Sequence, residues 1–239
     1  MTDSFIETIQ KSKTGAGNGT ALSCYETPLV TVDIVLCTVI QNRLKVLLIQ
    51  RKQPPYEHMW AIPGGFIHMG ETLEQAASRR LFEETNVNHI YLEQLGSFGQ
   101  PDRDPRARVI TVAYYALVSA EKLNVQAHAN AEDVGWFSVN ELPELGFDHA
   151  EIVQKALVKL KRHLESSSVA FQLLPDKFTL TELQRVYELI LGKTLDKRNF
   201  RKKILSSDIL KDTGETKMEG YHRPAQLYSF ASLRTAEAS

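Results

Sequence analysis

The stretch Gly65–Val87 constrains the fold of this chain most, because small, acidic and basic residues stand in it at fixed spacings. The glycines at its start indicate a loop, and apolar residues then recur at the helical period over residues 72–85. Arg80, Glu83 and Glu84 are three and four residues apart, so they share one helix face. The sequence therefore predicts a loop followed by a helix that presents charged groups beside that loop.

Apolar and β-branched segments on either side of this helix predict a sheet. Gln41-Asn42 is typical of a hairpin turn between two of the strands. The predicted strands are Thr31–Ile40, Lys45–Arg51, Tyr91–Phe98, Val109–Val118 and a segment around Trp136-Phe137. A charged loop, Asp102–Arg108, lies between the third and fourth strands, and an amphipathic helix over Ile152–Leu164 follows the last.

The spacing of Gly65–Val87 resembles the Nudix box, the loop–helix–loop of hydrolases that act on nucleoside diphosphates linked to another group. That pattern runs from a glycine to a glutamate six residues on, and then to Arg-Glu-aliphatic-X-Glu-Glu-X-Gly-aliphatic. An ordinary amphipathic helix with surface acids is the alternative. The resemblance implies an α+β chain that begins with a Nudix α/β/α sandwich around a mixed sheet. The residues that match are Gly65, Glu71, Arg79, Leu81, Glu83, Glu84 and Val87.

Two positions depart from the family pattern: Arg80 stands where the family has a metal-binding glutamate, and Asn86 stands where it has glycine. Asn tolerates the left-handed conformation that a helix end needs. The change at Arg80 is severe, because a guanidinium repels a divalent cation and can pair with the acids one turn on. We therefore expect no catalytic residue and no bound metal, unless an acid from a nearby loop replaces the lost ligand. The vestigial box comprises Gly65, Glu71, Arg79, Arg80, Glu83 and Glu84.

What remains is a nucleotide-shaped cleft that requires no cofactor. Arginine side chains and the Gly64-Gly65 backbone can face a diphosphate, because guanidinium forks match phosphate oxygens. Aromatic side chains are candidates for stacking on a base, although aromatics fill interiors more often than sites. The candidate effector-binding residues are Arg51, Gly64, Gly65, Phe66, Arg79, Glu83, Phe98 and Tyr114.

The chain changes character at Ser166, Ser167 and Ser168, which mark a boundary between two modules. The net charge of −1 divides into −4 over residues 1–166 and +3 over residues 167–239, so the two parts suit different partners. The order of elements after the boundary is helix–turn–helix followed by a wing. These elements are a helix capped by the Thr179–Glu182 box and ended by Gly192, a helix over Asp196–Ser206, and strands at Ile209–Lys211 and Gln226–Phe230.

The second of these helices has the features of a recognition helix. Phe200 and Ile204 share one face of it, while Arg198 and Lys202 lie opposite. Cations on such a face suit phosphates and guanine edges in a major groove. A solvated basic helix in a dimerisation domain is the alternative interpretation. The candidate DNA-binding residues are Thr179, Thr181, Lys197, Arg198, Asn199, Arg201, Lys202, Lys203, His222, Arg223 and Gln226.

These patterns divide the chain into three segments. Residues 1–28 are polar and are predicted to be a flexible N-terminal arm. Residues 29–165 are predicted to form a Nudix-like effector-binding domain, which includes a linking helix over 150–165. Residues 166–239 are predicted to form a winged-helix DNA-binding domain.

A Nudix domain followed by a winged helix is similar to the Nudix-related transcriptional regulators of NAD metabolism. The segments Gly146–His149, Lys197–Lys203 and Gly220–Ala225 look like that family. The resemblance implies a homodimeric repressor of NAD biosynthesis or salvage genes that binds palindromic operator DNA through its winged helices. It also implies ADP-ribose, or a related nucleotide, as the effector that releases the DNA.

Two other functions stay open. One alternative is an active ADP-ribose or sugar-nucleotide pyrophosphatase with an accessory tail, against which Arg80 argues. The other is a nucleotide-gated activator of a sugar-utilisation pathway. No apolar run approaches the roughly 18 residues of a membrane span, and the N-terminus lacks the pattern of a signal peptide. Cys24 and Cys37 are then expected to be reduced thiols. We therefore expect a cytoplasmic protein with no membrane partner.

Overall fold

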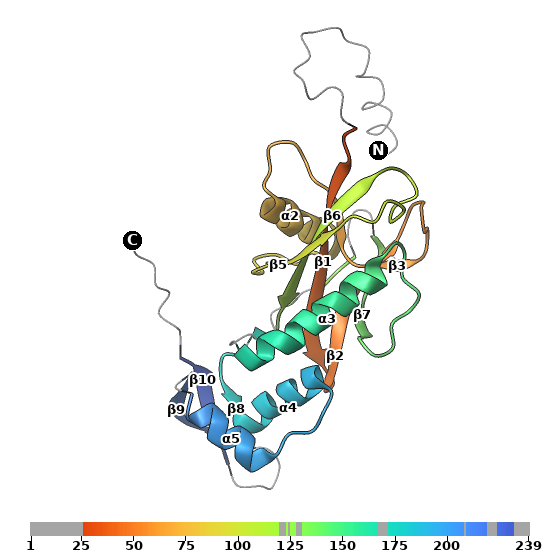
Figure 1. Cartoon of the computed structure of the whole chain (residues 1–239). Coiled ribbons are helices and arrows are strands. Elements are labelled where there is room, and N and C mark those ends of the chain that lie inside the picture. Colours follow the sequence, from red (N-terminus) through yellow and green to blue (C-terminus); the bar gives the residue numbers. More distant parts are fainter. Residues whose placement is uncertain are drawn as a thin grey trace.

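The computed structural model describes residues 26–119, 123, 125–127, 131–166, 172–207, 209–218 and 224–231. Most of the expected N-terminal arm (residues 1–25), Ser167 and Ser168 of the expected boundary, and His222 and Arg223 of the expected wing tip lie outside these ranges. Figure 1 shows a larger module built on a sheet and a smaller module at one end of it. Within the described ranges, no helix is long and apolar enough to cross a membrane.

The larger module is built on a seven-stranded mixed sheet. The hydrogen-bonded order is β3-β2-β1-β6-β5, while β4 pairs with β1 and β7 pairs with β2. Strand β1 runs parallel to β6 and antiparallel to β2 and β4. The strands are β1 (Leu29–Ile40), β2 (Arg43–Arg51), β3 (Trp60–Ala61), β4 (Gly64–Phe66), β5 (Glu93–Phe98), β6 (Val109–Leu117) and β7 (Ala131–Ser138).

Strand β1 is buried on both faces, because its side chains alternate between two cores. Ile34 and Leu36 pack with helix α2 (Leu73–Thr85), whereas Val35 packs on the opposite face with residues of α3 (His149–Ser166). One helix therefore covers each face of the sheet (Figure 1). This arrangement confirms the predicted α+β class and the α/β/α sandwich around a mixed sheet.

The local signals at the first turn and at α2 are confirmed. Gln41 and Asn42 have φ values of 52° and 59°, and positive φ at both positions is what a two-residue hairpin turn of type I′ requires. Thr72 caps α2 by accepting a hydrogen bond from the Gln75 N–H at 3.2 Å. Asn86 ends α2 in the left-handed conformation, with φ of 60°. Asparagine therefore serves where the Nudix pattern has glycine.

The C-terminal module has the predicted order of a winged helix. Helix α4 (Leu180–Leu191) begins at the Thr179 capping box and ends at Gly192, and α5 (Lys197–Leu205) begins after the Asp196 cap. The three strands pair in the order β8-β10-β9. Their bounds are Phe178–Thr179 for β8, Leu210–Lys217 for β9 and Ala225–Phe230 for β10.

Several strand boundaries differ from the sequence prediction, and those of β5 and β9 have a clear physical reason. Strand β5 begins at Glu93 rather than at Tyr91, whose side chain is 75% exposed. Strand β9 continues to Lys217, although the predicted strand ended at Lys211, where polar residues follow. Pairing with β10 keeps that segment extended, since its backbone and side chains bond across the hairpin. Polarity alone therefore ended the predicted strand too early, because an exposed edge strand needs no apolar residues.

Helix α3 joins the two modules through one continuous core. Leu160 and Leu164 of α3 are 1% and 3% exposed. They belong to the same cluster as Val46 in the large sheet and Leu183 and Ile190 in α4. Helix α4 also contacts β2 directly. The winged-helix module is therefore packed against the Nudix module rather than tethered to it.

Replacing Leu160 with alanine tests this shared core. We expect the free energy of unfolding to fall by about 2–5 kcal/mol, because a buried leucine leaves a cavity. Denaturant unfolding should still show one transition for both modules, since they share apolar contacts. The matched control is Val158→Ala on the same helix, where the side chain is 48% exposed and the change should stay within about 0.5 kcal/mol. Two separate transitions, of which only one shifts, would contradict a shared core.

Candidate functional site

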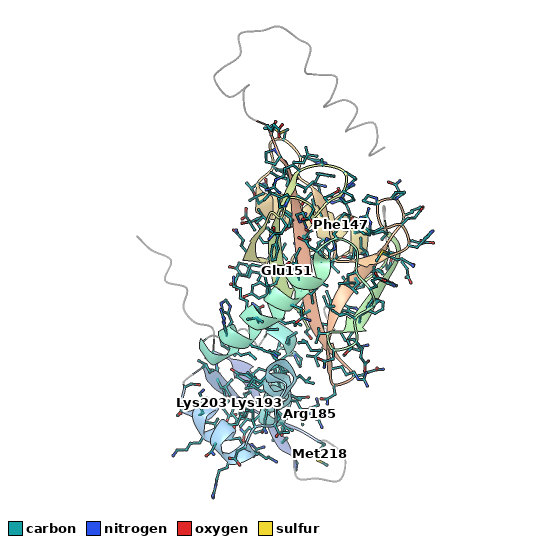
Figure 2. All side chains as sticks on the ribbon, turned by 45° about the vertical axis from the view of Figure 1, so that its right-hand side comes forward. Phe147, Glu151, Arg185, Lys193, Lys203 and Met218 are labelled. Atoms are coloured by element: carbon teal, nitrogen blue, oxygen red, sulfur yellow. The ribbon has the colours of Figure 1, made fainter. Side chains whose placement is uncertain are left out.

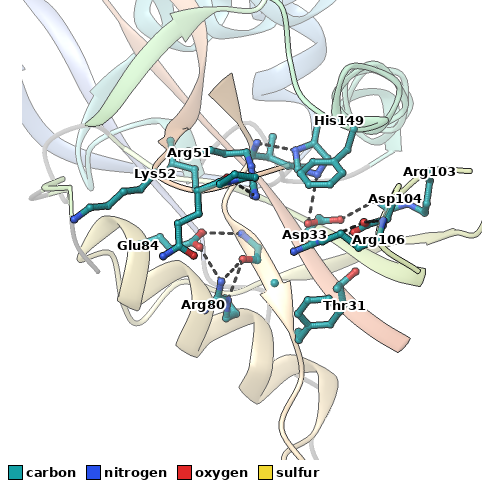
Figure 3. Close-up of a pocket in the computed structure, with 18 residues that line it drawn as sticks. Thr31, Asp33, Arg51, Lys52, Arg80, Glu84, Arg103, Asp104, Arg106 and His149 are labelled. Carbon is teal, nitrogen blue, oxygen red and sulfur yellow. Dashed lines mark hydrogen bonds and ion pairs between the residues drawn. The ribbon is translucent and has the colours of Figure 1, made fainter. Parts of the chain in front are cut away.

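A cavity opens where strands β1, β2 and β4 meet the loop before β6 and the start of α3 (Figure 3). Its lining carries five cationic side chains against three acidic ones, a formal net charge of +2. The cations are Arg51, Lys52, Arg80, Arg103 and Arg106, and the acids are Asp33, Glu84 and Asp104. A cavity with this balance favours an anion.

Arg80 makes a dense set of hydrogen bonds on the α2 side of this cavity. Its Nε and Nη2 donate to the Gly64 carbonyl oxygen at 2.9 and 2.7 Å. Nη2 also donates to Glu84 Oε1 at 2.9 Å (Figure 3). Nη1 donates to Glu83 Oε2 at 3.1 Å. The predicted pairing of Arg80 with acids one turn on is confirmed for both glutamates.

Glu84 is held between this guanidinium and the loop. Its side chain is 3% exposed, and its Oε2 accepts a hydrogen bond from the Gly64 N–H at 2.9 Å. Burial raises the pKa of Glu84 to about 7, although Arg80 and the Gly64 N–H both favour the charged form. Both carboxylate oxygens of Glu84 therefore accept hydrogen bonds from within the protein.

The oxygens that surround Arg80 do not fit a divalent cation. Magnesium takes oxygen ligands, and the nearby oxygens of Gly64, Glu83 and Glu84 already accept from the Arg80 guanidinium. In the part of the chain that the structure describes, no cluster of three His, Cys, Asp or Glu side chains could hold a metal ion. The Arg80 guanidinium therefore places a cation of the protein itself among these oxygens.

Arg79 lies on the same helix but does not line the cavity. Its Nη2 donates to Glu71 Oε1 at 2.6 Å, and its Nη1 donates to Glu83 Oε2 at 3.0 Å. The hydrogen bond from Arg79 lowers the pKa of Glu71 to about 2. Arg79 also donates to the Phe66 carbonyl oxygen. Its donors therefore fix the loop to the helix and are used within the protein.

A buried ion network lies at the start of α3. Arg103 donates to Asp148 at 2.7 and 2.9 Å and to Asp33 at 3.2 Å, and its side chain is 3% exposed. The His149 Nδ1 accepts from the Ile62 N–H at 3.1 Å, while its Nε2 lies 3.7 Å from Asp33 Oδ1. Because Nδ1 accepts the Ile62 N–H, the proton of the ring is on Nε2. Burial lowers the pKa of His149. The cavity is thereby bonded to the first turn of α3.

Aromatic rings and guanidiniums alternate along one wall of the cavity. The Arg51 Cζ lies 4.9 Å from the centroid of the Phe147 ring, and the Arg106 Cζ lies 5.3 Å from that of Phe66. Burial, with Arg106 nearby, lowers the pKa of Arg51. Phe147 has a φ of 57°, which is unfavourable for a bulky residue and is concentrated at functional sites. The wall thus combines flat apolar faces with phosphate-binding groups.

The structure brings together some of the predicted effector-binding residues and separates others. Arg51, Gly64, Gly65 and Phe66 line the cavity with Arg80. Arg79 and Glu83 pair with each other and do not line it. Phe98 and Tyr114 do not line it either. They are 6% and 1% exposed in the two cores, because the alternation of β5 and β6 turns these rings inward.

Sequence reasoning missed several residues of the cavity. Thr31 and Asp33 come from β1, Lys52 follows β2, Arg103 and Arg106 come from the loop before β6, and Phe147 and His149 stand at the start of α3. Two signals pointed to them. The Asp102–Arg108 loop was identified as charged, and the Gly146–His149 segment was identified as similar to a known family. Neither signal says where the segments meet, because that depends on the sheet.

The exposed face of α5 presents the predicted cations. Lys197, Arg198, Lys202 and Lys203 are exposed, as is Asn199, whereas Phe200 and Ile204 are buried against the module. Figure 2 shows Lys203 on the small module and Phe147 on the large one. The effector cavity and the basic helix are therefore separate surfaces joined by α3.

Four other candidate DNA-binding residues are buried, half-buried or bonded within the protein. Thr179 is 1% exposed and accepts the Glu182 N–H as the cap of α4, so its side chain does not reach the surface. Arg201 is half-buried, with its Nε buried and unbonded within the described residues. Gln226 is exposed but donates to both carboxylate oxygens of Asp212 at 2.6 and 2.7 Å. Thr181 is half-buried on α4.

Comparison with known families assigns both modules. The NUDIX domain family matches residues 30–156, and the NrtR DNA-binding winged helix domain matches residues 170–230. The "ADPR responsive transcriptional repressor NtrR" of Acinetobacter baylyi is 39% identical over 213 residues, which cover 87% of this chain and 84% of that protein.

Two solved structures extend this similarity. NrtR of Shewanella oneidensis in complex with a 27mer DNA is 38% identical and covers 84% of this chain and 93% of its own, with a TM-score of 0.72. The NUDIX domain of the same S. oneidensis protein, complexed with ADP ribose, is 39% identical with a TM-score of 0.54 and covers 60% of this chain and 94% of its own. The chain described here therefore belongs to the NrtR family of transcriptional repressors, in which a Nudix domain is joined to a DNA-binding winged helix domain.

Proposed function

We propose that this chain is a cytoplasmic, homodimeric repressor of NAD biosynthesis or salvage genes, and that ADP-ribose bound in the cavity releases it from palindromic operator DNA. One observation carries the proposal: a cationic, aromatic cavity is bonded directly to α3, the helix that packs against the winged helix. The DNA-bound and ADP-ribose-bound relatives support both halves of it.

The cavity has the chemistry that a nucleoside diphosphate requires. Its formal charge of +2 matches the two negative charges of a diphosphate that links two sugars. Guanidiniums bind phosphate oxygens through paired donors, and rings of the Phe66 and Phe147 type bind flat bases or sugars. The buried Thr31 hydroxyl lines the cavity and has no hydrogen-bond partner among the described residues. An unmade buried hydrogen bond is costly, so a polar ligand group there would be stabilised.

We further propose that the Nudix domain does not catalyse hydrolysis. Metal-assisted hydrolysis needs a cation that polarises phosphate and activates a water molecule. Arg80 supplies charge, but a guanidinium neither coordinates nor acidifies water. The oxygens that would ligate a metal already accept from Arg80. The domain then senses the nucleotide instead of consuming it.

The route from cavity to DNA runs along α3. His149 lines the cavity and is the first residue of α3. Asp148, just before it, accepts hydrogen bonds from Arg103. At the other end, Leu164 belongs to the core that contains α4. A rigid helix held at both ends transmits a small displacement along its length. In a homodimer, such displacements change the spacing of the two reading helices, which must lie about one helical turn of DNA apart.

The first prediction under this proposal concerns catalysis. We expect no release of AMP from ADP-ribose above background at millimolar Mg²⁺ or Mn²⁺, because Arg80 replaces a metal ligand. Chromatographic separation of the products measures this directly. Robust turnover would show that another acid has replaced the ligand, and the chain would then be a pyrophosphatase.

The second prediction concerns the reading helix. Lys202→Ala should weaken binding to all DNA sequences and lower the slope of log affinity against log salt by about one unit, because it removes a phosphate contact. Arg198→Ala should relax sequence discrimination by about 1–3 kcal/mol if it reads a base. Gel shifts on upstream DNA measure both. Arg108→Ala on the Nudix module, also exposed, is the control and should bind normally. Normal binding by both α5 variants would exclude α5 as the reading helix.

The third prediction concerns coupling between the modules. ADP-ribose should weaken operator binding by about 5- to 150-fold, and operator DNA should weaken ADP-ribose binding by the same factor, because coupling is reciprocal. Calorimetry with and without operator measures it, with NAD, ADP and AMP in the same series. Equal ADP-ribose affinities in both titrations would show that ADP-ribose is not the effector.

A further inference from the structure

We propose that the Arg80 guanidinium replaces the divalent cation of this cavity, so that the cavity binds the diphosphate of its ligand without any metal. This inference rests on the proposed function, because it takes a nucleoside diphosphate as the ligand. It goes beyond the loss of catalysis. A lost metal ligand alone would predict a weakened site, whereas a substituted cation predicts a working site with a different requirement.

The first argument is the set of atoms that Arg80 contacts. The guanidinium bonds one backbone carbonyl oxygen, on Gly64, and one carboxylate oxygen from each of Glu83 and Glu84, all at 2.7–3.1 Å. These are the ligand types that a hard dication takes. The Arg80 guanidinium therefore donates hydrogen bonds to the oxygens that a metal ion would otherwise bind. Its charge also compensates part of the negative charge of the two glutamates.

The second argument is charge. Three carboxylates at positions 80, 83 and 84 with one divalent cation would carry a net charge of −1. Arg80 with Glu83 and Glu84 carries the same −1 with no ion bound. An approaching diphosphate therefore meets the same formal net charge as at a metal-loaded site. Because the guanidinium cannot be deprotonated in proteins or removed by a chelator, that field does not depend on the metal supply.

The third argument is the fit of the loop around the side chain. Gly65 has a φ of 150°, and a Cβ atom placed on it would collide with the Arg80 guanidinium. The guanidinium therefore lies directly against the Gly64-Gly65 backbone, and its side chain is 16% exposed. Arg80 lines the same cavity as Arg51 and Arg106. A pre-positioned cation loses little freedom when it meets a phosphate.

The test is calorimetry on the full-length wild-type protein with ADP-ribose, in EDTA and then at millimolar Mg²⁺. We expect the two affinities to agree within about twofold, because no metal takes part. Binding of ADP-ribose only in Mg²⁺ would overturn the inference and leave the proposed effector intact. Binding of ADP but not ADP-ribose in EDTA would leave the inference standing and overturn the proposed effector. Binding of neither nucleotide in either buffer would overturn both.

Variants at position 80 sharpen the result. Arg80→Glu should weaken ADP-ribose binding in EDTA by roughly 10- to 100-fold, the loss expected for a charged hydrogen-bonding partner, and Mg²⁺ should recover most of that loss. Ser78→Glu, exposed on the same helix, is the matched control and should stay metal-independent. Wild-type affinity of Arg80→Glu in EDTA would contradict the role given to Arg80. If circular dichroism shows that Arg80→Glu does not fold, the wild-type comparison still decides.

Discussion

The burial of strand β1 on both faces is the constraint on which the rest of this structure depends. Its alternate side chains fill two cores, one under α2 and one that continues through α3 into the winged helix. A shift of one residue along β1 would exchange these faces and place Asp33 in the wrong core. Because the register is fixed in this way, Asp33 points toward Arg103 and His149. The ion network of the cavity is thus positioned by apolar packing.

The cavity concentrates like charges that stable proteins usually keep apart. Arg51 and Arg106 lie close enough for one to lower the pKa of the other, and internal acids neutralise only part of the excess. Such an arrangement is unfavourable in the empty protein and favourable once an anion enters. Phe147 adds backbone strain at the same place. Stability given up in this region is therefore recovered on ligand binding, which is the property that a sensor requires.

How far the sequence predicted this site depended on the distance between residues along the chain. The pairing of Arg80 with Glu83 and Glu84 followed from helical spacing, and the cap at Thr179 followed from the Thr179–Glu182 capping box. Arg103 and His149 did not follow, because they come from a loop and a helix start that only the folded sheet brings together. Phe98 and Tyr114 were placed in the cleft from residue type, but strand alternation turned both rings into the cores.

The continuous core under α3 has a consequence for how chains of this type are rebuilt or diversified. A reading head exchanged at the serine boundary would lose its fit to Leu160 and Leu164, because those side chains belong to the preceding module. A functional chimera must therefore inherit α3 together with the head, or carry compensating changes on α4. Cavity residues in the loops before β3 and β6 are free of that restriction. Ligand preference can then change quickly, while the packing of the winged helix on α3 changes only together with the preceding module.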